Sequence, residues 1–336
     1  MKTYRSSLRE NSREKTTMLP EKNIKAPSAR YASRLLAAVL VVMIFVFVGF
    51  DADAAVKQKG FATPEAAVKA FAAAMQSNDE PELLSIFGPT AKELISSGDP
   101  VRDKKQRERF INDYDRKNSI TQEGAKRVLV IGEKDWPFPI PLVKKAGRWI
   151  FDTKAGKEEV LNRRIGENEL STVQTLLAVV DAQREYAMKD RNNDGLRGYA
   201  EKFRSDPGKQ NGLYWETEEG AQPSPLGELV ADARAEGYAR TGTKQGPMPF
   251  HGYYFRMLKQ QGKNATGGAF DYVVKSKMIG GFAVVAYPAV YGNSGVMTFM
   301  VNHEGVVYEK DLGKNTAKTA KAMKAFDPDK TWRKAE

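Results

Sequence analysis

The 336-residue chain contains no cysteine. This absence excludes disulfide bonds, thiol nucleophiles, c-type haem attachment and metal centres built on cysteine. The stability of the fold must therefore come from hydrophobic cores, with a metal ion held by other side chains as the remaining aid. The chain is long enough for two domains that each bury a core of their own.

Histidine is scarce: only His251 and His303 are present, and neither has an HExxH or other metal-binding spacing. There is also no phosphate-binding loop and no G-x-G-x-x-G motif. Ser294 lacks the G-x-S-x-G context of a nucleophile elbow, and the acids Asp327 and Asp329 flank a proline, which is typical of a turn. We therefore predict no catalytic residue. A hydrolase that uses an aspartate with His251 or Ser294 is the alternative from the enzyme class.

The chain has one long apolar run, Leu35–Phe50, which follows Arg30 and Arg34 and leads to a small-x-small site ending at Ala54. This order is typical of a secretory signal peptide, and we predict that residues 1–54 are removed. The run is at the short edge of the ~17–25 residues that span a bilayer. We expect a periplasmic or secreted protein without a stable membrane span, or a membrane-anchored one if cleavage does not occur. Translation could start at Met1 or at Met18.

Apart from a basic helical segment predicted at Lys314–Ala325, charges of the two signs are mixed along the chain. The formal net charge is +11, but lysine and arginine are interspersed with aspartate and glutamate. A nucleic-acid-binding face would gather basic residues with aromatic residues between them, so we predict no nucleic-acid partner. The excess positive charge favours mild attraction to an anionic surface. The partner we expect is an envelope protein or a cell-surface component.

One motif indicates a specific chemistry. Asp190-Arg-Asn-Asn-Asp-Gly195, with Glu201 at the matching distance, fits the calcium-loop pattern D-x-[DN]-x-[DN]-G-x5-E. The predicted calcium ligands are the side chains of Asp190, Asn192, Asp194 and Glu201 and the carbonyl of Leu196. A bound ion would be structural. The alternative is a metal-free turn in which Asp194 caps the helix after Gly195. In either case a helix of about two turns is predicted through Glu201.

Residues 55–165 are predicted to form a first α+β domain. A helix starts at Thr63-Pro64, and three strands follow at 127–132, 140–143 and 148–152. This order of elements resembles the cystatin-like cone of the NTF2 superfamily, in which a curved sheet wraps a helix. The resemblance implies a small-molecule pocket, or a passive docking domain. Trp136, Phe138 and Trp149 would line such a pocket or belong to an ordinary core.

Residues 166–312 are predicted to form a second α+β domain, after a polar helical bridge at 156–167 and before a C-terminal tail at 313–336. A long helix from Asn168 to Lys189 precedes a β-rich segment. Ala182-Gln-Arg-Glu-Tyr186 and the later Gly252-Tyr-Tyr-Phe resemble the heads of type IV pilins and pseudopilins, where a helix packs on an antiparallel sheet. In pilins the apolar spine continues directly into the head helix, whereas about a hundred residues intervene here. The resemblance therefore implies a pilin-like head used as a module rather than a fibre subunit.

Several motifs together identify the chain as a member of a family of exported bacterial proteins known only as a domain of unknown function. These motifs are His251–Arg256, Met278–Ala283, Gly295–Phe299, Gly305–Leu312 and the closing Phe326-Asp-Pro-Asp-x-x-Trp332. The family brings no activity with it. We conclude that the chain has an α+β fold and is a non-enzymatic binding or assembly module of the envelope. The alternatives are a hydrolase of unknown substrate and a small-ligand carrier that uses the N-terminal domain.

Overall fold

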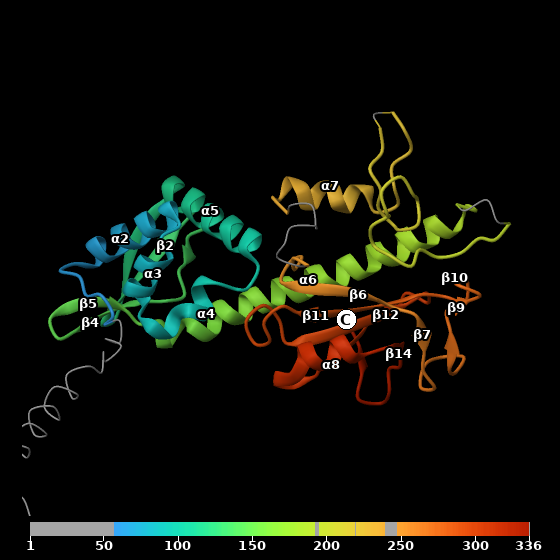
Figure 1. Cartoon of the computed structure of the whole chain (residues 1–336). Coiled ribbons are helices and arrows are strands. Elements are labelled where there is room, and N and C mark those ends of the chain that lie inside the picture. The colour runs from blue at the N-terminus through green and yellow to red at the C-terminus, as the bar shows by residue number, and fades with distance from the viewer. Residues whose placement is uncertain (1–56, 192–194, 219, 239–246, 336) are drawn as a thin grey trace, which may run out of the picture. The chain divides into compact units, whose positions relative to one another are not determined.

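The computed structural model describes residues 57–191, 195–218, 220–238 and 247–335 (Figure 1). The predicted signal peptide and the loop residues Asn192 and Asp194 lie outside the described residues. The fold mixes helices with antiparallel sheets, which confirms the predicted α+β class. The residues from Ala55 onward group into one compact unit, and the division at residue 165 stays a prediction.

The N-terminal helices begin where short capping signals stand in the sequence. The Thr63 hydroxyl accepts a hydrogen bond from the Ala66 amide (3.1 Å) in front of Pro64, as the Thr-Pro pair predicts. Asp79 and Asp99 cap the next helices in the same way, each one residue or two before a proline. The helices are α2 (Pro64–Ser77), α3 (Glu80–Phe87), η1 (Pro89–Ala91), α4 (Lys92–Ile95) and α5 (Pro100–Arg116).

These helices pack on a first antiparallel sheet with the order β1-β2-β4-β5, in which β3 pairs with β2. Its strands are β1 (Asn118–Glu123), β2 (Lys126–Ile131), β3 (Trp136–Pro137), β4 (Leu142–Lys145) and β5 (Arg148–Phe151). The core is centred on Phe71 of α2, which contacts the rings of four other phenylalanines at centroid distances of 4.9–5.4 Å. Such ring pairs add to the energy of simple burial. The strands predicted from apolar runs are confirmed, whereas the polar and mostly exposed β1 was not predicted.

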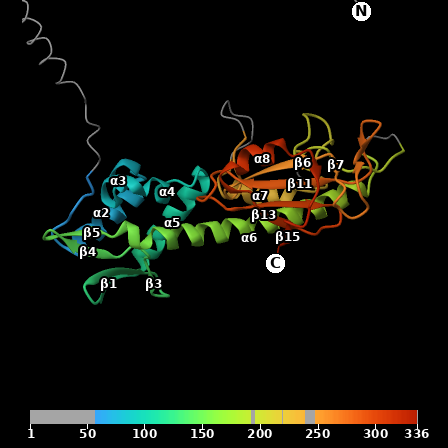
Figure 2. The ribbon, with the colours of Figure 1, turned by 90° about the horizontal axis from the view of Figure 1, so that it is seen from below.

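A single 35-residue helix, α6 (Thr153–Ala187), follows. It joins the segments predicted separately as a polar bridge and a long helix. Its first turn is tied to the first core, because the Thr153 hydroxyl donates a hydrogen bond to the Phe87 carbonyl (2.7 Å). Its C-terminal half buries Leu176, Val180 and Tyr186 in the second core. Figures 1 and 2 show that the first part of α6 lies along the N-terminal helices and sheet, and that its later part lies along the second sheet.

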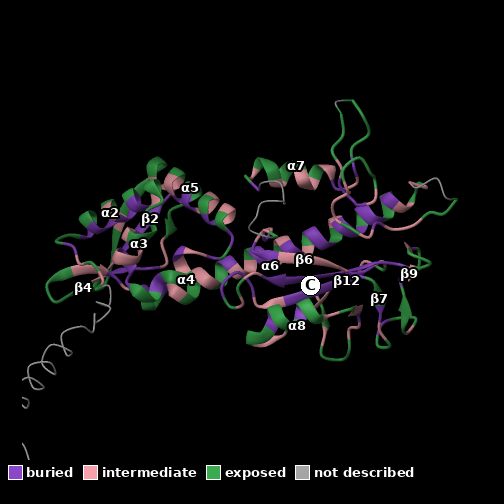
Figure 3. Ribbon diagram, viewed as in Figure 1, coloured by how far each residue is buried: buried purple, intermediate pink, exposed green. Residues whose placement is uncertain are grey.

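The second sheet has the order β15-β13-β12-β11-β6. All six residues of β11 are buried, because α6 covers one face of the sheet and α8 covers the other (Figures 2 and 3). The segment predicted as a tail supplies α8 and β15 to this layer. The elements of this half are α7 (Gly227–Ala235), β6 (Tyr253–Leu258), β7 (Gln260–Gln261), β8 (Phe270–Asp271), β9 (Val273–Val274), β10 (Lys277–Met278), β11 (Ala283–Pro288), β12 (Met297–Asn302), β13 (Tyr308–Asp311), η2 (Gly313–Asn315), α8 (Thr316–Ala322), β14 (Ala325–Phe326) and β15 (Arg333–Lys334).

Buried polar groups join the two layers around the middle of α6. The fully buried carboxylate of Asp99 accepts hydrogen bonds from the Tyr238 hydroxyl (2.8 Å) and the Gly252 amide (2.9 Å). The Asn168 side chain donates to the Ser294 carbonyl at 2.8 Å. Buried polar groups are tolerated when they are hydrogen-bonded, so this network fixes the contact between the helices of the first layer and the turns of the second.

The prediction of a helix after the Asp190 loop is wrong. Residues 196–204 are irregular, because their backbone groups bond to other segments instead of to the next helical turn. The Tyr199 amide donates to the Met278 carbonyl (2.7 Å), and the Phe203 carbonyl accepts from the Tyr214 amide (2.8 Å). These tertiary hydrogen bonds override the local preference for a helix.

Candidate functional site

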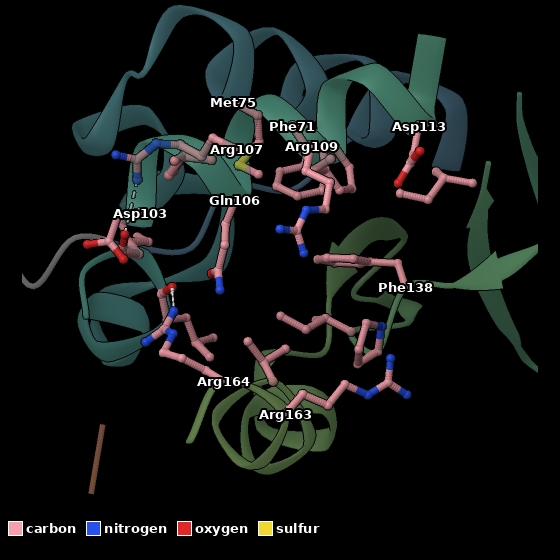
Figure 4. Close-up of a pocket in the computed structure, with 18 of the residues that line it drawn as sticks. Phe71, Met75, Asp103, Gln106, Arg107, Arg109, Asp113, Phe138, Arg163 and Arg164 are labelled. Carbon is pink, nitrogen blue, oxygen red and sulfur yellow. Dashed lines mark hydrogen bonds between the residues drawn. The ribbon is translucent and has the colours of Figure 1, made fainter. Parts of the chain in front are cut away.

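A cavity of about 390 Å³ lies in the N-terminal half between α2, α5, the segment around β3 and the first part of α6 (Figure 4). Its volume falls in the range of ~300–1,000 Å³ that is usual for small-molecule sites. The lining residues come from positions 71 to 167 of the chain. The cavity is therefore built by tertiary packing of several elements and not by one motif.

The inner wall of the cavity is aromatic. Phe71 of α2 lies 4.9 Å from Phe110 of α5 and 5.0 Å from Phe138, measured between ring centroids. The Phe138 amide donates to the Leu129 carbonyl at 2.7 Å, so the residue after β3 is held against β2. Met75 completes this wall (Figure 4). Aromatic rings and a flexible thioether give an adaptable apolar surface.

Helix α6 forms the opposite wall, and a glycine sets its position. A Cβ atom on Gly156 would lie 2.4 Å from the Pro139 carbonyl oxygen and 2.7 Å from the Ile140 Cα. Only glycine lets the helix come this close to the 139–140 segment. Pro139 and Ile140 both line the cavity, as does Val160 one turn further along α6. The close contact at Gly156 thus fixes the width of the cavity.

Arginines dominate the polar part of the lining. They are Arg107 and Arg109 of α5 and Arg163 and Arg164 of α6, with Gln106 beside them. In Figure 4 the side chains of Gln106 and Arg109 point into the cavity. Arg163 lies at the edge with its guanidinium carbon 5.3 Å from the ring centre of Trp136, a cation–π contact. Arg109, Arg163 and Trp136 are exposed, so the cavity opens to solvent on this side.

Two of these arginines are buried and partly unsatisfied. Arg107 is 9% and Arg164 5% exposed. Arg107 donates to the Ile95 carbonyl (3.2 Å), and Arg164 donates to the carbonyls of Glu93 (2.7 Å) and Leu94 (2.6 Å). The Nε atom of each arginine has no hydrogen-bond acceptor among the described residues. Buried donors without an acceptor are uncommon in folded proteins.

Burial also shifts the protonation equilibria of the inner charges. Burial raises the pKa of the Asp103 carboxyl, while hydrogen bonds from Ser97 and the charges of Arg164 and Arg107 act in the opposite direction. Burial lowers the pKa of the Arg164 guanidinium, and the Asp103 charge opposes that shift. Each group would lose its charge more readily without the other. Asp103 and Arg164 therefore support each other's charged form.

The sequence left open whether Trp136, Phe138 and Trp149 line a pocket or belong to an ordinary core. Trp136 and Phe138 line the cavity, but Trp149 does not. Trp149 lies in β5, where its backbone pairs with Phe61 and the Arg127 guanidinium lies 5.4 Å from its ring centre. The arginines were missed. Their spacing on α5 and α6 was the available signal, but charged helix positions are more often solvated than turned toward a cavity.

The predicted calcium loop is described only in part. Asp190 follows α6, and its Oδ2 atom accepts a hydrogen bond from the Gly195 amide (2.8 Å), where Gly195 has a left-handed φ of 78°. Leu196 and Glu201 line a smaller cavity of about 190 Å³, and Glu201 pairs with Lys259. Among the described residues, which leave out Asn192 and Asp194, no three acidic or histidine side chains gather as a metal site. Calcium binding stays a prediction.

The residues of the hydrolase alternative are held in structural contacts. The His251 Nε2 atom lies 2.9 Å from a Glu236 carboxylate oxygen. Ser294 is fully buried, and its hydroxyl bonds to the Val290 amide and carbonyl within one turn. Asp327 accepts a hydrogen bond from the Asn264 amide. None of His251, Ser294 and Asp327 lines the cavity between α2, α5 and α6.

A family model described as "Protein of unknown function (DUF2950)" matches residues 58–335. The chain belongs to this family. No curated protein and no solved structure matches the chain. The match confirms the predicted membership of a family of unknown function, and it spans both sheets and the whole of α6. The described residues contain no helix long and apolar enough to cross a bilayer.

Proposed function

We propose that this DUF2950 protein is a non-enzymatic binding module of the bacterial cell envelope that holds a small apolar molecule in the cavity between α2, α5 and α6. The observation that carries the proposal is the cavity itself, which combines a volume of about 390 Å³ with an aromatic wall. Such a site is the usual form of a small-molecule pocket. This conclusion favours the carrier among the functions that the sequence left open.

The chemistry of the lining supports binding over catalysis. The lining residues include no serine, threonine, tyrosine or histidine. Two of the three acids already accept hydrogen bonds, Asp103 from the Ser97 amide (2.9 Å) and Glu167 from Arg102 (3.0 Å). The strongest remaining features are apolar rings and cationic donors. Rings and cationic donors can bind a ligand, but they do not supply a nucleophile or a general base.

The expected affinity follows from ligand size. N-phenyl-1-naphthylamine is a neutral fluorescent probe of about 17 non-hydrogen atoms, and at about 0.3 kcal/mol per atom it would bind with about 5 kcal/mol. This corresponds to a dissociation constant of about 0.2 mM or tighter. Its fluorescence rises when it leaves water for an apolar site, so saturable enhancement measures binding directly.

A pair of variants on one helix tests whether the probe occupies this cavity. Val160→Trp places an indole in the cavity, whereas Leu170→Trp places it at a position of α6 that is 64% exposed and outside the lining. We expect Val160→Trp to weaken probe binding at least tenfold and Leu170→Trp to leave it unchanged. No saturable binding by the unmodified protein, or equal binding by both variants, would contradict the proposal.

Calcium binding by Asp190, Asn192, Asp194, Leu196 and Glu201 is proposed as a structural aid, not as part of the cavity. The contact from the Asp190 carboxylate to the Gly195 amide supports it, because it bends the chain at the glycine of the pattern. The contact between Glu201 and Lys259 opposes it, because calcium would have to displace the ammonium group. Export, cleavage after Ala54 and an envelope or cell-surface partner belong to the same proposal and rest on the sequence.

A further inference from the structure

The charged side chains around the cavity between α2, α5 and α6 are unevenly paired. Its acids are mostly engaged, as described for Asp103 and Glu167. Arg109, in contrast, has no ion-pair or hydrogen-bond partner among the described residues, and it forms no ion pair with Asp113, which lies one turn further along α5. Arg163, by comparison, is ion-paired with Glu159 (2.6 Å). Arg107 and Arg164 donate to backbone carbonyls, so within the described chain Arg109 is the lining arginine left with a free cationic group next to the aromatic wall.

Two buried arginines add positive charge beside the cavity. Arg107 and Arg164 line the cavity, are more than nine-tenths buried, and each keep one Nε–H group without an acceptor. These Nε–H groups are enclosed by protein atoms, so the two arginines act on the cavity through their charge and not through a hydrogen bond to a ligand.

Gln106 and Arg109 are placed to contact such a group first. Both side chains come from the same face of α5 and point into the cavity in Figure 4. An amide NH₂ and a guanidinium together offer donors to two oxygens of one head group, and guanidinium binds planar oxyanions with two hydrogen bonds. The rings of Phe71, Phe110 and Phe138 lie behind them and would contact the apolar remainder.

We infer that the ligand of this cavity is an amphipathic anion, whose carboxylate, sulfonate or phosphate group binds Arg109 and Gln106 and whose apolar body packs against Phe71, Phe110 and Phe138. The inference rests on the proposed function and specifies the class of ligand for the same site. On the inner side Arg107 and Arg164 outnumber Asp103 and leave a net positive charge, whereas Arg163 at the edge is paired with Glu159.

Two probes with the same ring system separate this inference from the proposed function. N-phenyl-1-naphthylamine is neutral, and 1-anilinonaphthalene-8-sulfonate adds one sulfonate to the same skeleton. We expect the purified protein to bind the sulfonate about tenfold more tightly, since a hydrogen bond to a charged group at an exposed site lies at the low end of its range. Added salt should reduce this preference.

Matched variants on α5 locate the anion. Arg109→Gln should remove most of the preference for the sulfonate and leave neutral-probe binding within twofold, which also shows that the variant is folded. Arg116→Gln removes an exposed arginine of the same helix outside the lining and should change neither probe. Asp113→Asn removes a negative charge from the lining and should strengthen sulfonate binding.

Displacement of the neutral probe then identifies the head group. Decanoate and decyl phosphate should displace it better than decanol, and the better of the two acids assigns carboxylate or phosphate. Equal displacement by decanol, or equal affinity of the protein for both fluorescent probes, would overturn the anionic ligand while leaving an apolar pocket intact. Failure of both probes to bind would overturn the proposed function and this inference with it.

Discussion

We expect two glycine-to-alanine substitutions in α6 to change stability in opposite directions. Alanine in a helix interior is favoured over glycine by about 0.5–1 kcal/mol. At Gly166 a Cβ atom would have no other atom within 4 Å, so Gly166→Ala should raise the free energy of unfolding by this full amount. At Gly156 the Cβ atom would lie 2.4 Å from a backbone carbonyl oxygen.

The magnitude at Gly156 follows from these two contributions. Overpacking costs about 1–3 kcal/mol. Two of the three nearest atoms, the Pro139 carbonyl oxygen and the Ile140 Cα, belong to the backbone and cannot rotate aside, and the third is the Ile140 Cγ1. After the gain in helix preference is subtracted, Gly156→Ala should lower the free energy of unfolding by about 1–2 kcal/mol. For a protein of this size each kcal/mol shifts the melting temperature by about 2–4 °C.

Thermal unfolding followed by circular dichroism measures both shifts, and the neutral probe measures their effect on the cavity. Because Pro139 and Ile140 line the cavity, Gly156→Ala should also weaken probe binding, whereas Gly166→Ala should not. A rise in melting temperature for both variants would refute the reasoning. It would mean that α6 does not pack closely on the 139–140 segment and that the cavity wall lies elsewhere.

Four further predictions concern other parts of the chain. Asp99→Asn replaces one acceptor oxygen of a buried carboxylate with a donor, and it should destabilise the fold by about 2–4 kcal/mol in urea unfolding; an unchanged midpoint would show that the network is dispensable. Burial lowers the pKa of His251, against the attraction of Glu236, so the unfolded chain binds the proton more readily and stability should fall as the pH drops below about 6.5. The melting temperature should then decline from pH 7.5 to 5.5, and less steeply in His251→Gln; parallel pH profiles would contradict this. Millimolar calcium should raise the melting temperature of chelator-treated protein but not that of Asp190→Ala, and an equal response of the two would remove the site. N-terminal sequencing of the exported protein should start near Ala55, and recovery of the intact leader in a membrane fraction would show that it serves as an anchor.

Local signals predicted the elements that depend on neighbours in sequence. The Thr63-Pro64 pair marks the start of α2, and apolar runs mark β2, β11 and β12, because capping and strand burial act within a few residues. Helix α6 was divided in two because positions 156–167 are polar. There the buried Arg164 and Asn168 donate hydrogen bonds to carbonyls 70 or more residues away in the sequence, which no local pattern reveals.

The candidate site shows the same limit. Trp136 and Phe138 were candidates for either a pocket or a core by sequence, whereas Arg109 is one of many charged helix residues. Its importance depends on which face of α5 turns toward α6, and that is decided by packing around Phe71 and Phe110. The prediction of a helix at Glu201 is wrong for a similar reason, because the backbone groups of this segment form hydrogen bonds with residues that are distant in the sequence.

The continuity of α6 restricts which changes of length the family can tolerate. Each inserted residue turns the rest of a helix by about 100° and advances it by about 1.5 Å. One residue added between Arg164 and Leu176 would turn Leu176 and Val180 away from the second sheet. The part of α6 that lines the cavity, before the insertion, would stay in place. Seven added residues would restore the angle to within about 20° but lengthen the helix by about 10 Å, too far for Asp99 still to reach the Gly252 amide. Substitutions on the outer face of α6 should therefore be common among relatives, while insertions and deletions within it should be rare.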